Sequence, residues 1–179
     1  ILWEKVQAEP NITLLLNTAC TGARMASCSR IAAVTASRHC TEDVFEIGGH
    51  VFVDCTGDGR LGAEAGADFR YGREGPQEHG EPHAQGPDRY TMGCSLMWRA
   101  RDMGHPVPFY TPPYAQVYER CEDLPHRAHT ELEWGHWWIE WGGELNIIKD
   151  YERIRDQLLA CLMGVWDHIK HRCPQVDAT

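Results

Sequence analysis

The residues best suited to chemistry in this 179-residue chain surround one glycine-rich turn. A predicted strand at residues 50–53 leads to Thr56-Gly57-Asp58-Gly59, and the small residues that follow predict a helix. Gly57 and Gly59 permit a positive φ or close backbone approach, and the Asp58 carboxylate can accept hydrogen bonds from sugar-alcohol hydroxyls. The helix start adds N–H groups and the positive end of a dipole. The order of strand, turn and helix therefore predicts a site for a phosphate-bearing dinucleotide.

Two other interpretations of this turn stay open. Asp54, Thr56 and Asp58 match the first half of a calcium loop, but its twelfth position holds Ala65 where a bidentate Glu is needed. A plain Asp-Gly turn between a strand and a helix needs no ligand at all. The turn alone does not decide between these interpretations.

Further blocks along the chain add to the turn. They are Trp3 with Pro10-Asn11-Ile12, Val53 to Gly59, Ala65-Gly66-Ala67, Gly72-Arg73-Glu74, Thr91-Met92-Gly93, residues 137–143 and residues 164–170. In this order they resemble a bacterial branch of the FAD-dependent oxidoreductases with the glutathione-reductase type of fold. The resemblance covers nearly the whole chain, and it is specific in the ordered set rather than in any one block. It implies FAD as the cofactor and a small molecule as the substrate.

The resemblance also implies which residues contact FAD. The turn residues Thr56, Gly57, Asp58 and Gly59 would line the ribityl and pyrophosphate part of the cofactor. A strand leading to Cys20 would bring backbone close to the adenine, although a half-buried strand thiol is the alternative for this residue. Hydride or electron transfer would belong to the flavin, so the protein would supply orientation and charge.

Cationic and titratable side chains near a group of tryptophans are the candidate catalytic residues. These candidates are Arg127, His129 and His136, which could bind a substrate anion or stabilise charge on the reduced flavin. Their alternative is a solvated surface turn. The tryptophans at 134, 137, 138 and 141 could stack on a flavin or a sugar, or fill a core.

Two other functional classes are weighed against the flavoprotein. One is a binding module for carbohydrate that uses the tryptophans, and the other is a His/Cys metal protein. The eight cysteines include no C-x-x-C pair, and the donors of His79-x-Glu81-x-His83 are separated by Gly80 and Pro82, which disfavour a helix. No metal ligands are therefore predicted.

One expected element of the family is missing from residues 1–49. These residues hold no G-x-G-x-x-G turn, which normally carries the FAD pyrophosphate, and the first residue is Ile1. The sequence is therefore interpreted as a fragment of a longer enzyme. By itself it is expected to bind FAD weakly or not at all and to be inactive, and to associate with the missing amino-terminal part.

The composition of the chain excludes some classes of binding partner. The net charge of −9 and the absence of a basic patch argue against nucleic acid, and no apolar run predicts a membrane span. Eight cysteines without paired spacing favour thiols in a reducing, cytoplasmic compartment. The apolar stripe of the last predicted helix could also drive self-association if it were left exposed.

The predicted elements give a mixed architecture. Strands are expected at 12–18, 31–37, 44–47 and 50–53, the last two joined at Gly48-Gly49 as a hairpin, which makes a short β-meander. Another is expected at 91–99. A helix is predicted from Tyr151 to Arg172, capped by Asp150, with an apolar stripe of Ile154, Leu158, Leu162, Val165 and Ile169.

These elements predict an α/β fold, of α+β type within this sequence. The first part, residues 1–90, is expected to belong to a Rossmann-like FAD-binding domain. The second part, residues 91–179, is expected to form part of a substrate or cap domain that ends in the long helix.

Overall fold

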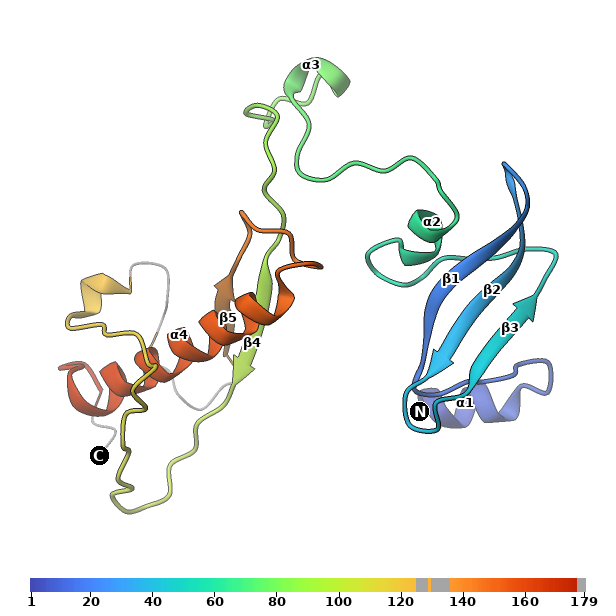
Figure 1. Cartoon of the computed structure of the whole chain (residues 1–179). Helices are drawn as coiled ribbons and strands as arrows, with labels where there is room; N and C mark the ends of the chain where they lie inside the picture. Colours follow the sequence, from blue (N-terminus) through green and yellow to red (C-terminus); the bar gives the residue numbers. More distant parts are fainter. Residues whose placement is uncertain (125–128, 130–135, 177–179) are drawn as a thin grey trace. The chain divides into compact units, whose positions relative to one another are not determined.

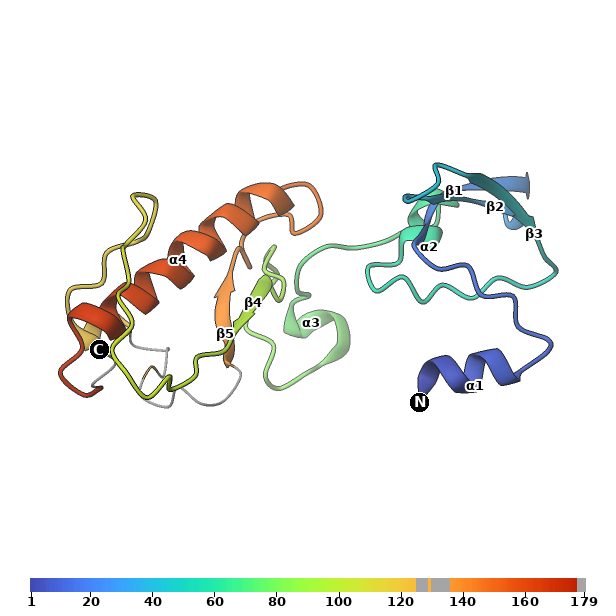
Figure 2. The same ribbon diagram turned by 90° about the horizontal axis from the view of Figure 1, so that it is seen from below.

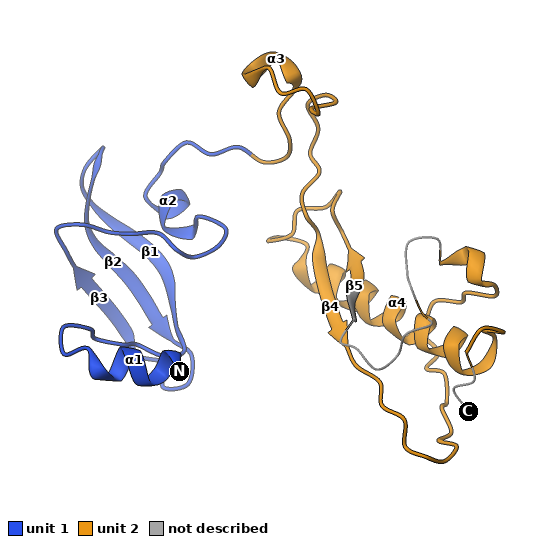
Figure 3. Cartoon of the chain, turned by 180° about the vertical axis from the view of Figure 1, so that it is seen from behind, with its two compact units in different colours: residues 1–70 blue, residues 71–179 orange. Residues whose placement is uncertain are grey.

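The computed structural model describes residues 1–124, 129 and 136–176, and not the side chains of residues 136–138. The chain forms two compact units, Ile1–Arg70 and Tyr71–Thr179 (Figure 3). The first unit contains α1 (Leu2–Ala8), β1 (Thr18–Ser27), β2 (Arg30–Arg38), β3 (Val44–Gly48) and α2 (Arg60–Glu64). The second contains α3 (Pro76–His79), β4 (Cys94–Trp98), the 3-10 helix η1 (Cys121–Asp123), β5 (His136–Trp141) and α4 (Tyr151–His171). The mixture of helices and antiparallel sheets confirms the α+β prediction.

The first unit is built on an antiparallel meander in the order β1-β2-β3 (Figure 1). The register of β1 against β2 shifts between Cys20 and Gly22, so that Thr21 forms a bulge. The guanidinium of Arg60 in α2 donates to the Thr21 carbonyl at 3.4 Å. Helix α2 therefore lies against the bulged part of β1, and its Leu61 is buried. The meander confirms the prediction made from residues 31–47.

Two other predicted strands of this unit are wrong. Residues 12–17 are irregular, and Asn17 has a φ of 52°, so β1 begins only at Thr18. Residues 50–53 form no strand, and Val51 and Val53 remain 80% and 78% exposed. Alternating apolar residues favour a strand only where a neighbouring strand accepts the hydrogen bonds, and within the described residues this segment has none.

The second unit is built on helix α4 and a two-stranded antiparallel sheet of β4 and β5. Figures 1 and 2 show α4 along one face of this sheet. The buried core between them contains Leu124, Ile139, Ile154, Leu158, Cys161, Val165 and Ile169. Four of the five residues in the predicted apolar stripe belong to this core, and the fifth, Leu162, packs against it.

The second unit begins earlier in the chain than the expected boundary at residue 90. The Tyr71 hydroxyl donates to the Leu145 carbonyl and accepts from the Ile147 N–H at 3.2 Å. The Arg73 side chain pairs with Asp88, which closes the intervening loop. These contacts tie the glycine-rich segment after Tyr71 to the second unit.

Helix α4 confirms the prediction for residues 151–172 apart from its cap. The Asp150 carboxylate accepts from the Asn146 N–H at 3.0 Å and makes no side-chain cap bond, while its main-chain carbonyl accepts from Ile154. At the other end, the buried Asp167 carboxylate contacts His171 at 2.9 Å and also pairs with Arg172. Among the described helices, none combines the length and apolar character that crossing a membrane requires.

Substitution of Gly164 tests the packing of α4. Helix propensity alone predicts that Gly164→Ala stabilises the protein by about 1 kcal/mol. A Cβ at this position would, however, lie 2.1 Å from the Gln116 carbonyl oxygen. Because this neighbour is backbone, we expect a net destabilisation of about 1–2 kcal/mol, measured by denaturant unfolding. In the control Gly86→Ala, whose Cβ would meet nothing within 4 Å, the change should be smaller than about 1 kcal/mol. A stabilised Gly164→Ala protein would contradict the described packing.

Candidate functional site

The glycine turn of the first unit is held by one carboxylate. Asp54 Oδ1 accepts from the Thr56 N–H at 3.0 Å and from the Thr56 hydroxyl at 2.7 Å. Its other oxygen, Oδ2, accepts from the Gly62 N–H at 2.9 Å. These bonds, the one from the Thr56 hydroxyl above all, hold the pKa of Asp54 below its usual range. Asp54 therefore links the segment before the turn to helix α2.

Thr56 adds a second link across the same turn. Its Oγ1 accepts from the Arg60 N–H at 2.7 Å. The N–H groups of Arg60 and Gly62 are thus used within the chain, and α2 is only five residues long. Two of the first three N–H groups of α2 therefore already have acceptors within the turn. The Thr56 hydroxyl thus bonds within the turn on both sides, to Asp54 and to the Arg60 N–H.

The tip of the turn is open. Gly57 and Gly59 have φ values of 87° and 68°, as the sequence predicts, and a Cβ at either would meet nothing within 4 Å. Asp58 lies between them with its side chain exposed, and within the described residues its carboxylate makes no hydrogen bond or ion pair. The tip thus presents an anionic acceptor flanked by backbone that a ligand can approach closely. Such a surface suits a ligand that carries hydroxyl groups.

Cys20 lies in β1 beside the bulge, in the same unit as the turn. Its side chain is half-buried, and its Sγ lies 3.9 Å from the Gly22 carbonyl oxygen. The contact between Arg60 and Thr21 joins α2 to this part of β1. The turn and the backbone around Cys20 are therefore on neighbouring elements of one compact unit.

The candidate catalytic residues fall in the second unit, and only one side chain of the three is described. Arg127 lies outside the described residues. His136 is the first residue of β5, paired with Trp98, and its side chain is not described. His129 is buried, and its ring centroid lies 5.1 Å from that of His168.

Sequence reasoning missed the residues that surround His129. Cys121, His168 and Cys173 bring their donor atoms to within 4.8 Å of one another and of a His129 ring nitrogen. These residues are far apart in the sequence, so their proximity could not be predicted from it. The one available signal was the spacing of His168 and Cys173, five positions apart at the end of a predicted helix. The donors of His79-x-Glu81-x-His83 do not gather in this way in the described part of the chain.

Comparison with known protein families identifies the family of this chain. The family model described as FAD dependent oxidoreductase matches residues 1–168. The chain belongs to this family. Membership confirms the resemblance seen in the sequence blocks, and it assigns FAD as the cofactor, a flavin-dependent oxidoreductase kind of function and a small-molecule substrate. Comparisons with curated proteins and with solved structures gave no match.

Removal of the Thr56 hydroxyl tests the internal bonding of the turn. Because this hydroxyl is the largest cause of the lowered pKa of Asp54, Thr56→Val should raise that pKa toward its usual range. The measurement is an NMR titration of the Asp54 carboxyl carbon. The control Thr41→Val, which removes a hydroxyl bonded to Asp43 instead, should leave the pKa of Asp54 unchanged.

The same titration gives the pH dependence of the turn. Asp54 has a lower pKa in the folded chain than in the unfolded chain, so its stabilising effect is complete above the unfolded pKa. It is lost as the pH falls through the folded pKa, where the Gly62 amide signal should shift with the Asp54 carboxyl. An unshifted Asp54 pKa in Thr56→Val would contradict the assignment of Thr56.

Proposed function

We propose that the tip of the glycine turn contacts the ribityl chain of FAD in an enzyme that oxidises or reduces a small molecule. The observation that carries this proposal is the exposed Asp58 carboxylate, placed between two glycines with positive φ on a turn fixed by Asp54. A carboxylate in this position accepts hydrogen bonds from sugar-alcohol hydroxyls, and such charge-assisted bonds are stronger than neutral ones. The family match supports FAD as the molecule that supplies them.

The residues of the turn have different roles in this proposal. Asp58 binds a ribityl hydroxyl, while Gly57 and Gly59 let the cofactor approach the backbone without a side chain in the way. Asp54 and Thr56 hold the turn in its conformation through hydrogen bonds within it and to α2. The bound flavin accepts and donates the electrons, so these residues supply position rather than reactive groups.

We also propose that the substrate side lies in the second unit, where Arg127 and His136 bind an anionic group of the substrate. His129 is better suited to another role, because its buried ring lies against His168. A buried imidazole held by neighbouring side chains contacts protein rather than substrate.

The alternative of a carbohydrate-binding module is predicted from Trp134, Trp137, Trp138 and Trp141. Trp134 and the side chains of Trp137 and Trp138 lie outside the described residues. Trp98 and Trp166 form an edge-to-face pair with centroids 5.2 Å apart, and Trp141 packs against the core. These rings stabilise the contact between α4 and the β4–β5 sheet. A sugar platform would need such rings on an open surface.

Substitution of Asp58 tests the proposed cofactor contact. Losing a hydrogen bond to a charged acceptor costs about 1.5–3 kcal/mol, which is about a ten- to hundredfold loss of affinity. Asp58→Ala should therefore weaken FAD binding by that factor in an equilibrium titration followed by flavin fluorescence. Asp68→Ala, which removes another exposed carboxylate of the same unit, is the control and should bind FAD as the unaltered chain does. Equal affinities of Asp58→Ala and the control would remove Asp58 from the site.

A further inference from the structure

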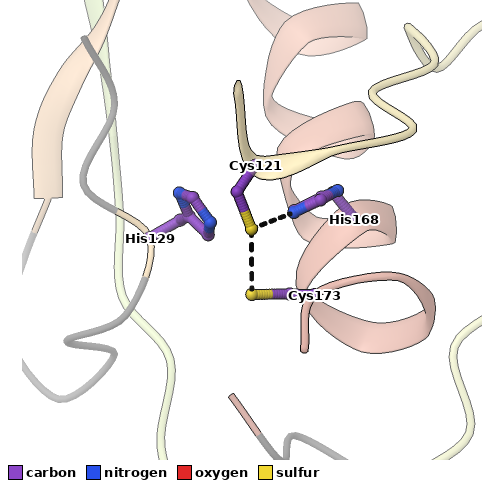
Figure 4. A group of neighbouring side chains, drawn as sticks. All are labelled: Cys121, His129, His168 and Cys173. Carbon is purple, nitrogen blue, oxygen red and sulfur yellow. Dashed lines mark hydrogen bonds between the residues drawn. The ribbon is translucent and has the colours of Figure 1, made fainter. Parts of the chain in front are cut away.

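Four side chains with metal-binding donor atoms lie close together in the second unit. In the sequence they are distant from the glycine turn. This Cys–His cluster consists of Cys121, His129, His168 and Cys173, whose donor atoms all lie within 4.8 Å of one another (Figure 4). Cys121 begins η1, and His168 lies in the last turn of α4. Cys173 follows the end of α4, and His129 approaches from a separate segment with its ring directed toward Cys121.

Two distances within the cluster match those of a tetrahedral zinc site. Cys121 Sγ lies 3.8 Å from Cys173 Sγ and 3.5 Å from His168 Nε2. Bond lengths of about 2.3 Å for Zn–S and about 2.05 Å for Zn–N place two sulfurs about 3.8 Å apart and a sulfur and a nitrogen about 3.5 Å apart. The 3.8 Å between the sulfurs is far longer than a disulfide bond of about 2.05 Å. These two separations therefore correspond to edges of a coordination tetrahedron, and the remaining donor pairs lie within 4.8 Å.

The orientation of His168 also suits a metal ligand. Its Nδ1 lies 2.8 Å from the Tyr118 carbonyl oxygen, which can only accept a hydrogen bond. Nδ1 therefore carries the proton, and the lone pair of Nε2 points toward Cys121 Sγ. Metal-ligating histidines usually donate their second N–H to a carbonyl or carboxylate, which fixes the ring and its tautomer.

Burial and charge favour a dication at this place. His168 is fully buried, and His129 and Cys173 are only 6% and 9% exposed. Two thiolates in such a buried position need a compensating positive charge. A dication with two thiolates and two neutral imidazoles has no net charge. Such a neutral complex is compatible with a buried position.

We propose that the Cys–His cluster binds one structural zinc ion. All four positions of the tetrahedron come from the protein, which is typical of structural rather than catalytic zinc. The ion would join the segment around η1 to the end of α4. This role goes beyond the proposed flavin function and does not depend on FAD.

Metal content and cobalt spectroscopy of the 179-residue chain test this proposal. Purified under reducing conditions with zinc supplied, the chain should contain about one zinc ion by mass spectrometry. Cobalt(II) in place of zinc should give the intense visible bands of a tetrahedral thiolate complex. Cys121→Ser should weaken zinc binding by more than about a hundredfold, because even changes outside the first ligand shell cost about 10–100-fold.

Controls separate the site from nonspecific binding and from misfolding. The double variant Cys28→Ser, His83→Gln removes one exposed thiol and one exposed imidazole and should keep the full zinc content. In the unaltered chain, a chelator should lower the melting temperature, and one equivalent of zinc should restore it. Absence of both zinc and the cobalt bands in the unaltered chain would overturn the proposal. Equal metal loss in the control, or a Cys121–Cys173 disulfide in the freshly purified chain, would do so as well.

Discussion

The Asp54 carboxylate is the constraint on which the proposed cofactor contact depends. Its two oxygens receive three hydrogen bonds, two from Thr56 and one from Gly62, and these connect the start of the turn to α2. Two glycines in one turn would otherwise leave the backbone free to move, since glycine loses more conformational entropy on ordering than any other residue. Because Asp54 fixes both ends of the turn, Asp58 is held at its tip with the carboxylate exposed.

In the second unit, the orientation of α4 about its own axis positions both the hydrophobic core and the Cys–His cluster. The apolar stripe that includes Ile154, Leu158 and Val165 fixes which face of the helix lies against the β4–β5 sheet. The same orientation buries His168 and directs its ring toward Cys121, with the Tyr118 carbonyl behind it. A single amphipathic helix thus organises both the hydrophobic core and the Cys–His cluster.

Local patterns in the sequence predict the elements whose stabilising contacts are close in the chain. The 3.6-residue periodicity after Asp150 gives α4, and the glycines at 57 and 59 give the positive φ of the turn. The strands expected at residues 12–18 and 50–53 are wrong, because a strand depends on a partner that local alternation does not reveal. The Cys–His cluster was missed for a related reason, since Cys121 and His168 meet only after the chain has folded.

The residues of the glycine turn also fall into those that the sequence predicts and those that it does not. Its open residues, Gly57, Asp58 and Gly59, could be predicted from the turn motif and the family resemblance. The roles of Asp54 and Thr56 could not, because they depend on which N–H groups their side-chain oxygens meet. The sequence likewise did not show that Thr56 and Asp54 accept from the N–H groups of Arg60 and Gly62 at the start of α2.

The most direct test of the proposed cofactor contact is an NMR titration of the 179-residue chain with FAD, followed through its backbone amides. Because residues 1–49 hold no G-x-G-x-x-G turn, binding by this chain is expected to be weak, so the shifts at Gly57, Asp58 and Gly59 should be small and rise with FAD concentration without saturating. Gly104, an exposed glycine of the second unit that also has a positive φ, is the control and should not shift. Shifts confined to the turn would support the cofactor contact, whereas an unchanged turn, or equal shifts at Gly104, would contradict it.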